Sequence, residues 1–305
     1  MYIEQLKKLR PSLILYLPIP LGFIGMMIWN YIISLDVDTA EMMNQMIAML
    51  GVNMTFVIML APLVIGLFVV LLWTKFIQNI SITMLTTSRS KIDWQRIFFS
   101  FFLWTAITTF LVLVAYFLNP ENFELNFKPT QFFVFLALAI LLIPLQTSFE
   151  EYLFRAHMMQ GIGLATNSRL IPLVITSVLF GLMHAANPEV GKVGWLIMIY
   201  YIGTGFFLGI ITLMDEGLEL ALGFHAANNL VGALLVTADW TAFQTHSIFK
   251  DISEPSAGFE IILPIFVIFP LLLFFFSKKY KWNNWKQKLT GKLIETEIEN
   301  DTSLH

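Results

Sequence analysis

The sequence predicts an all-α, polytopic membrane protein, and three observations favour this fold class: composition, the length of the apolar runs, and the placement of basic residues. Apolar residues make up 57% of the 305 residues and charged residues only 13%, and the mean hydropathy is +0.74. A soluble domain carries about 25% charged residues and could not bury so much apolar surface. We therefore expect lipid to be the solvent for most of the chain.

The apolar runs predict about eight spans, because a membrane-spanning helix needs about 20 mostly apolar residues. The fourth run contains Glu150, Glu151 and Arg155, and the fifth and seventh are short and contain histidines, so these three suit a plain lipid-facing helix least. The predicted spans are residues 13–35, 55–76, 97–118, 131–158, 170–187, 194–214, 218–236 and 259–276.

Basic residues alternate between the connections in a way that tests this count. Fifteen of the eighteen lysines and arginines lie at the N-terminus, in the tail, or near the connections after even-numbered spans. The other side keeps only Lys128, Lys192 and Lys250. The positive-inside rule therefore predicts that both termini are cytoplasmic. No small-residue cleavage site follows the first run, so we expect it to be a retained span rather than a signal peptide.

Three regions follow from this organisation. Residues 1–126 form an N-terminal region of three spans, residues 127–240 carry the polar motifs, and residues 241–305 hold the last span and a basic, then acidic, cytoplasmic tail. The chain has no cysteine, which excludes disulfides, thiolate zinc sites and a cysteine nucleophile. The net charge of −3 gives no reason to expect a nucleic-acid partner.

Ionisable residues inside predicted spans are costly and usually functional. Glu151 and Arg155 are four residues apart, so they share a helix face and can pair, whereas Glu150 points about 100° away. A carboxylate left without that partner in a poorly solvated cavity suits a general base. The alternative is that both glutamates only form ion pairs that fix helix packing.

Two histidines complete the polar set. His184 lies late in the fifth span, and His225 lies in the seventh, where it shares a face with Asn229. The helical rise places Glu150 about 17 Å and His184 about 22 Å from the loop that connects their spans. We therefore expect Glu150, His184 and His225 to converge on a cavity that opens to the cytoplasm.

The polar residues form three motifs, EExxxR, FxxxH and HxxxN, which follow one another between residues 131 and 236. In this order and on successive hydrophobic helices, they resemble the type II CAAX prenyl endopeptidase and bacteriocin-processing family of intramembrane proteases, also called CPBP or Abi. The resemblance covers about a third of the chain. Its motif residues are Glu150, Glu151, Arg155, Phe180, His184, His225 and Asn229.

The resemblance implies an intramembrane endopeptidase and a role for each motif residue. Glu150 and His184 would activate the attacking water, and His225 and Asn229 would stabilise the oxyanion of the tetrahedral intermediate. Structural support is the implied role of three further residues: Glu151, Arg155 and Phe180. The cofactor stays open between a divalent metal such as zinc, with Glu150, His184 and His225 as candidate ligands, and a metal-independent, glutamate-dependent route.

Other functions fit the sequence less well. The chain contains no HExxH, GxGD or GxS, which excludes three other classes of intramembrane protease. A transporter is disfavoured because the polar residues are concentrated in one half without an inverted repeat. A non-enzymatic immunity or regulatory protein that binds a partner in the same cavity remains the alternative. We expect a peptide or membrane-protein substrate and a multi-pass protein of a bacterial cell membrane, with the oligomeric state left open.

Overall fold

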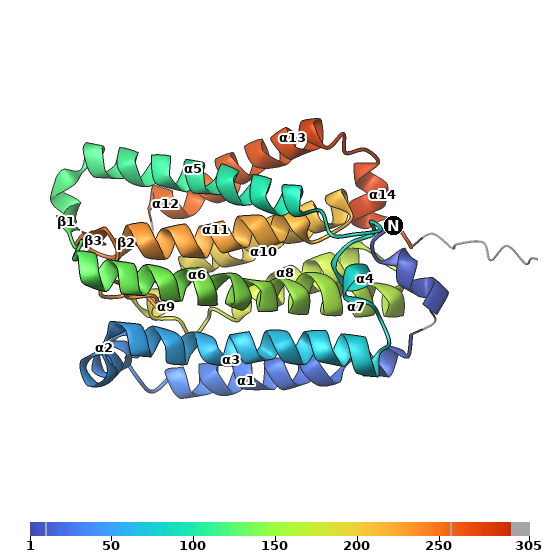
Figure 1. The fold of residues 1–305 in the computed structure, drawn as a ribbon, viewed down its shortest axis with the longest axis horizontal. Helices are drawn as coiled ribbons and strands as arrows, with labels where there is room; N and C mark the ends of the chain where they lie inside the picture. The colour runs from blue at the N-terminus through green and yellow to red at the C-terminus, as the bar shows by residue number, and fades with distance from the viewer. Residues whose placement is uncertain (10, 257, 294–305) are drawn as a thin grey trace, which may run out of the picture.

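Helices lie along the long axis of the molecule, with α5 and α13 along one side and α1 and α3 along the other (Figure 1). The structure is a computed structural model that describes residues 1–9, 11–256 and 258–293. The α-helices are α1 Pro18–Ser34, α2 Thr39–Leu50, α3 Val52–Leu72, α4 Ile82–Thr86, α5 Trp94–Leu118, α6 Pro129–Glu151, α7 Met159–Thr166, α8 Leu170–Leu182, α9 Pro188–Val193, α10 Met198–Asp215, α11 Glu219–Leu235, α12 Phe259–Leu263, α13 Phe269–Lys279 and α14 Trp285–Thr290.

Within the described residues, six helices are long and apolar enough to cross a membrane, which confirms a polytopic helical membrane protein. The predicted fifth and seventh spans correspond to shorter helices, α8 with 13 residues and α11 with 17. Helix α8 holds Phe180 of the FxxxH motif and ends before His184, and α11 holds His225 and Asn229. The six long helices are Leu13–Ser34, Val52–Ile77, Trp94–Leu118, Pro129–Thr166, Trp195–Asp215 and Ile261–Lys279.

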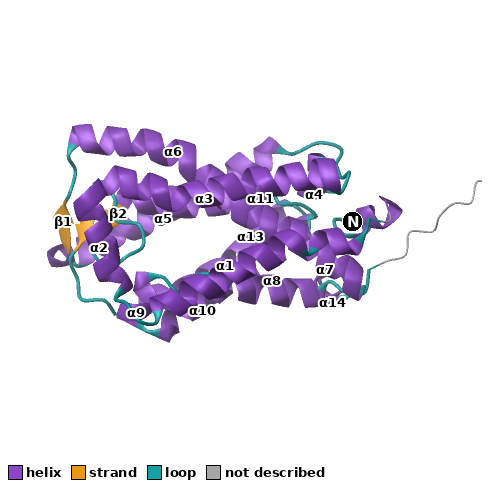
Figure 2. Cartoon of the chain, turned by 90° about the horizontal axis from the view of Figure 1, so that it is seen from below, coloured by secondary structure: helices purple, strands orange, loops and turns teal. Residues whose placement is uncertain are grey.

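A small sheet and an extra helix lie at one end of the bundle, and the sequence pattern predicted neither. Strand β3 (Phe249–Asp251) pairs antiparallel with β1 (Phe123–Leu125) and parallel with β2 (Val236–Thr237). Helix α2 begins at the N-cap Asp38, whose side chain accepts hydrogen bonds from two backbone N–H groups. Figure 2 shows α2, α9 and the strands at the end opposite the N-terminus, and we call this the α2–α9 end.

Glycines bring the helices close together around the polar motifs. Helix α10 packs along α8, and α11 packs along α5. A Cβ atom on Gly205 of α10 would lie 2.5 Å from the carbonyl oxygen of Ser177 in α8. A Cβ atom on Gly223 of α11 would meet the carbonyl oxygen of Ile97 in α5. The missing side chain at Gly205 therefore allows α10 to pack closely against α8.

Buried ion pairs close the end that holds the N-terminus and α14. Arg169 is fully buried and pairs with Glu4. Asp215 accepts hydrogen bonds from Arg89 and Arg96, and Arg89 also reaches Glu219 at 3.1 Å. We call this the closed end. The three basic residues assigned to the other side of the membrane lie at the α2–α9 end, on the N-cap of α6, on α9 and on β3: Lys128, Lys192 and Lys250.

The acidic end of the tail, residues 294–305, lies outside the described residues. The basic part that precedes it folds against the closed end. Lys288 of α14 contacts Glu216 at 3.3 Å and donates to the carbonyl oxygen of Met214, and the Trp282 indole donates to Asp215. The tail therefore contributes to the fold rather than only to the membrane surface.

Candidate active site

A long helical rod carries the two glutamates into the middle of the bundle. Helix α6 ends at Glu151, continues through a π-helical turn, Tyr152–Met158, and resumes as α7, so that Pro129–Thr166 forms one rod of 38 residues. Pro144 lies inside α6 without ending it. Single π-helical turns within α-helices occur frequently at functional sites. Here the turn begins directly after the glutamate pair.

Glu151 is the centre of a buried charge cluster. Its Oε1 atom accepts a hydrogen bond from Nη1 of Arg155 at 3.0 Å, as the four-residue spacing predicts. The same oxygen lies 2.7 Å from Nδ1 of His225. Arg155 also donates to the carbonyl oxygen of Gly205 at 3.2 Å and stacks over the ring of Phe180 at 4.0 Å. Glu151 therefore joins α6, α10 and α11, and it orients a histidine as well as an arginine.

Glu150 faces the other side of the same histidine. Its Oε2 atom lies 3.4 Å from Nε2 of His225, and its Oε1 atom accepts a hydrogen bond from Gln146. Gln146 in turn accepts a hydrogen bond from Asn229 at 3.3 Å. Arg155 pairs with Glu151 and not with Glu150, as the spacing predicts, and His225 projects from α11 between the two carboxylates. The Oε2 atom still has no hydrogen-bond partner among the described residues.

His184 reaches the site from a turn rather than from a helix, since α8 ends two residues earlier. Its Nδ1 atom lies 2.9 Å from the carbonyl oxygen of Phe180, and its ring stacks on Tyr201 with 4.2 Å between the ring centroids. The ring of Phe180 packs edge-on against both His184 and His225. Phe180 therefore packs beside His184, as the motif implies, and separates the two histidines.

A cavity of about 560 Å³ lies beside these residues. Glu150, His184 and Asn229 line it, whereas His225 lies behind Glu150 and is 3% exposed. The cavity extends from Glu150 toward the α2–α9 end, where Asn30 of α1 also lines it. The cavity therefore opens away from the end that holds the N-terminus, so cytoplasmic termini and a cavity open to the cytoplasm, both expected from the sequence, do not hold together.

The candidate metal ligands Glu150, His184 and His225 do not converge on one point. Over residues 1–9, 11–256 and 258–293, no three histidine, aspartate or glutamate side chains are placed to hold one ion. Glu150 and His225 are neighbours, but no hydrogen bond or ion pair joins His184 to either of them in this part of the chain. The residues as arranged do not fit a three-ligand zinc site, and no step below is derived through a metal.

Four residues that sequence reasoning missed complete the site. Gln146 bridges Glu150 and Asn229, and its position four residues before Glu150 on an apolar helix was a signal for a shared face.

The Trp104 indole donates to Asn228 at 3.1 Å, and Tyr201 stacks on His184. The fourth is Glu189 on α9, which also lines the cavity. Burial raises the pKa of the Glu189 carboxyl. No sequence pattern pointed to Trp104 or Tyr201.

The fold and the site define a helical membrane protein with a buried carboxylate–imidazole centre on the wall of a cavity. The motif resemblance is confirmed over this part of the chain: residues 129–231 match the family model of the type II CAAX prenyl endopeptidase Rce1-like proteins. The chain is 32% identical over 164 residues to the uncharacterized protein YyaK of Bacillus subtilis (strain 168). That alignment covers 53% of this chain and 55% of YyaK, so the chain spans about half the length of this relative. No solved structure matches the chain.

Proposed function

We propose that the protein is an intramembrane endopeptidase that hydrolyses a peptide bond of a membrane-associated peptide or protein. The observation that carries the proposal is the free Oε2 atom of Glu150. It is buried, has no hydrogen-bond partner among the described residues, and belongs to a residue that lines the cavity together with His184. The Rce1-like match over residues 129–231 supports the same activity.

In the proposed reaction, Glu150 and His184 activate a water molecule. A carbonyl oxygen can only accept, so Nδ1 of His184 donates to Phe180 and its Nε2 atom is left with a lone pair. That lone pair and the free Glu150 oxygen are two acceptors for the two hydrogens of one water. Glu150 takes one proton as the water oxygen attacks the peptide carbonyl, and the proton later passes to the leaving amine.

His225 and Asn229 are proposed to stabilise the oxyanion. Nδ1–H of His225 donates to Glu151, which fixes the ring so that Nε2 points toward Glu150, and Nε2 is a donor when the ring carries its second proton. Asn229 uses one amide hydrogen on Gln146 and keeps a second one for the cavity. Glu151 and Arg155 hold this arrangement through contacts that link three helices. Fixed donors of this kind act where negative charge develops in acyl transfer.

We further propose eight spans with both termini in the cytoplasm. The two helices that fall short of a full span, α8 and α11, are the ones that bring His184 and His225 to the site. Helices can be short in the membrane where they line a cavity and are buried in protein. A reporter fused at residue 36 and another at residue 293 should lie on opposite sides of the membrane.

The experiment that tests the activity compares membrane peptides by mass spectrometry between cells with the wild-type protein and cells with Glu150→Ala. An endopeptidase predicts that at least one uncleaved peptide accumulates in the variant, while the protein level in the membrane stays the same. A deletion strain that Glu150→Ala restores fully, with unchanged peptides, would instead support the non-enzymatic binding protein. Metal analysis and a chelator challenge of the purified protein decide the cofactor.

A further inference from the structure

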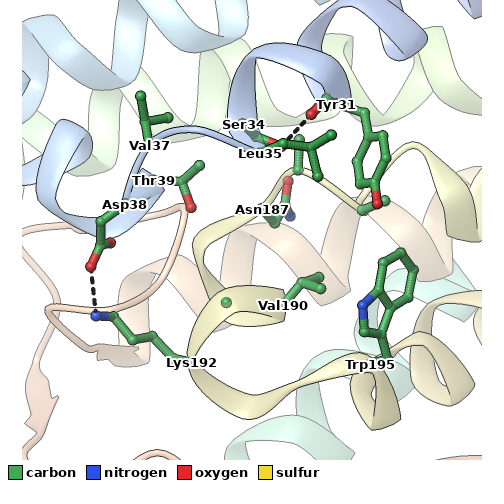
Figure 3. A pocket seen from close by; sticks show the side chains of 13 residues that line it. Tyr31, Ser34, Leu35, Val37, Asp38, Thr39, Asn187, Val190, Lys192 and Trp195 are labelled. Carbon is green, nitrogen blue, oxygen red and sulfur yellow. Dashed lines mark hydrogen bonds and ion pairs between the residues drawn. The ribbon is translucent and has the colours of Figure 1, made fainter.

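The cavity beside Glu150 continues into a second hollow at the surface of the α2–α9 end. This hollow has a volume of about 370 Å³ and shares three lining residues with the cavity: Tyr31, Ala186 and Asn187. Figure 3 shows Asn187 between the two sides of the hollow, with Asp38 and Lys192 joined across it at 3.2 Å. We call this hollow the vestibule, because it connects the cavity to the surface.

An exposed ion pair and an edge-on contact between the rings of Tyr31 and Trp195 cross the vestibule. Asp38 caps α2 and Lys192 belongs to α9, and more than a third of each side chain is exposed. Exposed ion pairs add little to stability, so opening this ion pair costs little. At the other end of the bundle, Arg169 and Glu4 are paired and buried.

The membrane orientation proposed from the basic residues then determines which side the vestibule faces. The closed end holds the N-terminus and α14, and the charge distribution assigns it to the cytoplasm. The vestibule lies at the opposite end, beside Asp38, in a loop that carries no lysine or arginine. It therefore faces the outer side of the membrane.

The charges in the cavity indicate which substrates it accepts. Among the described residues, no lysine or arginine lines it, whereas two glutamates do, Glu150 and Glu189. The Oε1 atom of Glu189 accepts a hydrogen bond from the backbone N–H of Ala242 at 2.9 Å. Its Oε2 atom is buried and has no hydrogen-bond partner among the described residues. A cationic group would pair with this oxygen, whereas a terminal carboxylate would find no cation in the lining.

We propose, building on the endopeptidase function above, that the substrate is a positively charged peptide segment that enters from the outer side through the vestibule, and that Glu189 binds its cationic group. Glu189 is then a positioning residue for the segment whose peptide bond reaches Glu150. The apolar walls, which include Met26, Met27 and Met59, suit the rest of a membrane peptide, because methionine adapts to different side chains.

The direction of entry is tested by single cysteines, since the chain has none of its own. Val37→Cys places a thiol in the vestibule, and Lys286→Cys places one on α14. A membrane-impermeant maleimide should label Val37→Cys in intact cells and Lys286→Cys only after the cells are permeabilised. The reverse pattern would overturn outward entry. Labelling does not depend on catalysis, so its outcome is separate from that of the proposed function.

The role of Glu189 is tested by binding. The probes are two fluorescent membrane-spanning peptides of the same leucine-rich sequence, one with a single lysine near its outer end and one with glutamine there. The inactive Glu150→Gln protein in detergent should bind the lysine peptide about tenfold more tightly, the effect of one charge-assisted hydrogen bond. Adding Glu189→Gln should abolish this preference, and adding Glu121→Gln, an exposed carboxylate at the same end, should keep it.

A lysine preference that survives Glu189→Gln would overturn the assignment of this residue. If the preference follows Glu189 while the wild-type protein cleaves no peptide, the binding site is supported and the endopeptidase function fails. If cleavage is observed without any charge preference, the endopeptidase function is supported and the cation site at Glu189 fails.

Discussion

Carboxylates at the closed end lie opposite arginines, whereas Glu150 and Glu189 line a cavity that has no lysine or arginine among its described lining residues. Arg169 pairs with Glu4, and Asp215 forms ion pairs with Arg89 and Arg96. At the cavity, one oxygen of Glu150 and one of Glu189 have no partner among the described residues. One oxygen of Glu4 also lacks a partner in this part of the chain, so Glu150 and Glu189 are distinguished by lining the cavity, where a substrate can reach them. Substitutions at the cavity should therefore lower the rate of cleavage, and substitutions at the closed end should lower stability.

The largest expected effect belongs to the cavity. His184→Phe should keep the stack on Tyr201 but remove the Nε2 lone pair, so cleavage should fall by about 10²–10⁴-fold with little change in thermal stability. The matched control is His157→Phe, a buried histidine outside the site whose ring lies 5.0 Å from that of Tyr16. Cleavage per folded molecule should be normal in the control. Equal losses in both variants would show that His184 is only a packing residue.

At the closed end, the effect should fall on stability. Arg169→Met leaves Glu4 buried without its cation, which should lower the free energy of unfolding by about 3–5 kcal/mol. Unfolding of the purified protein in detergent measures this. Replacing both partners, Arg169→Met with Glu4→Leu, should restore most of the loss. Cleavage per folded molecule should stay normal. A loss of cleavage without a loss of stability would contradict a purely structural role of the closed end.

Gly205 lets α10 pack closely against α8, and this contact supports both the cavity and the closed end. Gly205→Ala should push α10 away from the backbone of Ser177 and cost about 1–3 kcal/mol of stability. Gly25→Ala in α1 is the control, since nothing lies within 4 Å of the added Cβ atom there. That variant should be neutral or slightly more stable. If both variants have the same unfolding midpoint, the close approach at Gly205 is not a determinant of the fold.

The smallest effect is expected at the bridge between Glu150 and Asn229. Gln146→Leu removes one hydrogen bond to each of them, a change of about 1–2 kcal/mol, which corresponds to roughly a 5–30-fold loss of cleavage. The loss should appear in kcat rather than in KM, because the substrate does not need Gln146 to enter. Gln146→Glu, which keeps an acceptor for Asn229 but repels Glu150, should be at least as impaired. Unchanged kcat in both would remove Gln146 from the site.

Much of the fold and part of the candidate site could be predicted from the sequence. The pairing of Glu151 with Arg155 follows from helical spacing, and hydropathy locates the long apolar helices. The position of His225 between two carboxylates could not be predicted, because it depends on the packing of α11 against α6. The direction of the cavity also escaped prediction. It depends on which end the ion pairs fill, and partners such as Glu4 and Arg169 are 165 positions apart in the chain.

The central claim is that Glu150 performs chemistry at the cavity rather than holding the fold. Its most direct test uses wild-type and Glu150→Gln proteins, purified and reconstituted in liposomes with a peptide that accumulates in Glu150→Ala cells. Glutamine keeps the size and the contact with Gln146 but cannot take a proton. We predict cleavage by the wild-type protein, none by Glu150→Gln, and the same unfolding midpoint for both. Cleavage at the wild-type rate by Glu150→Gln would contradict the account.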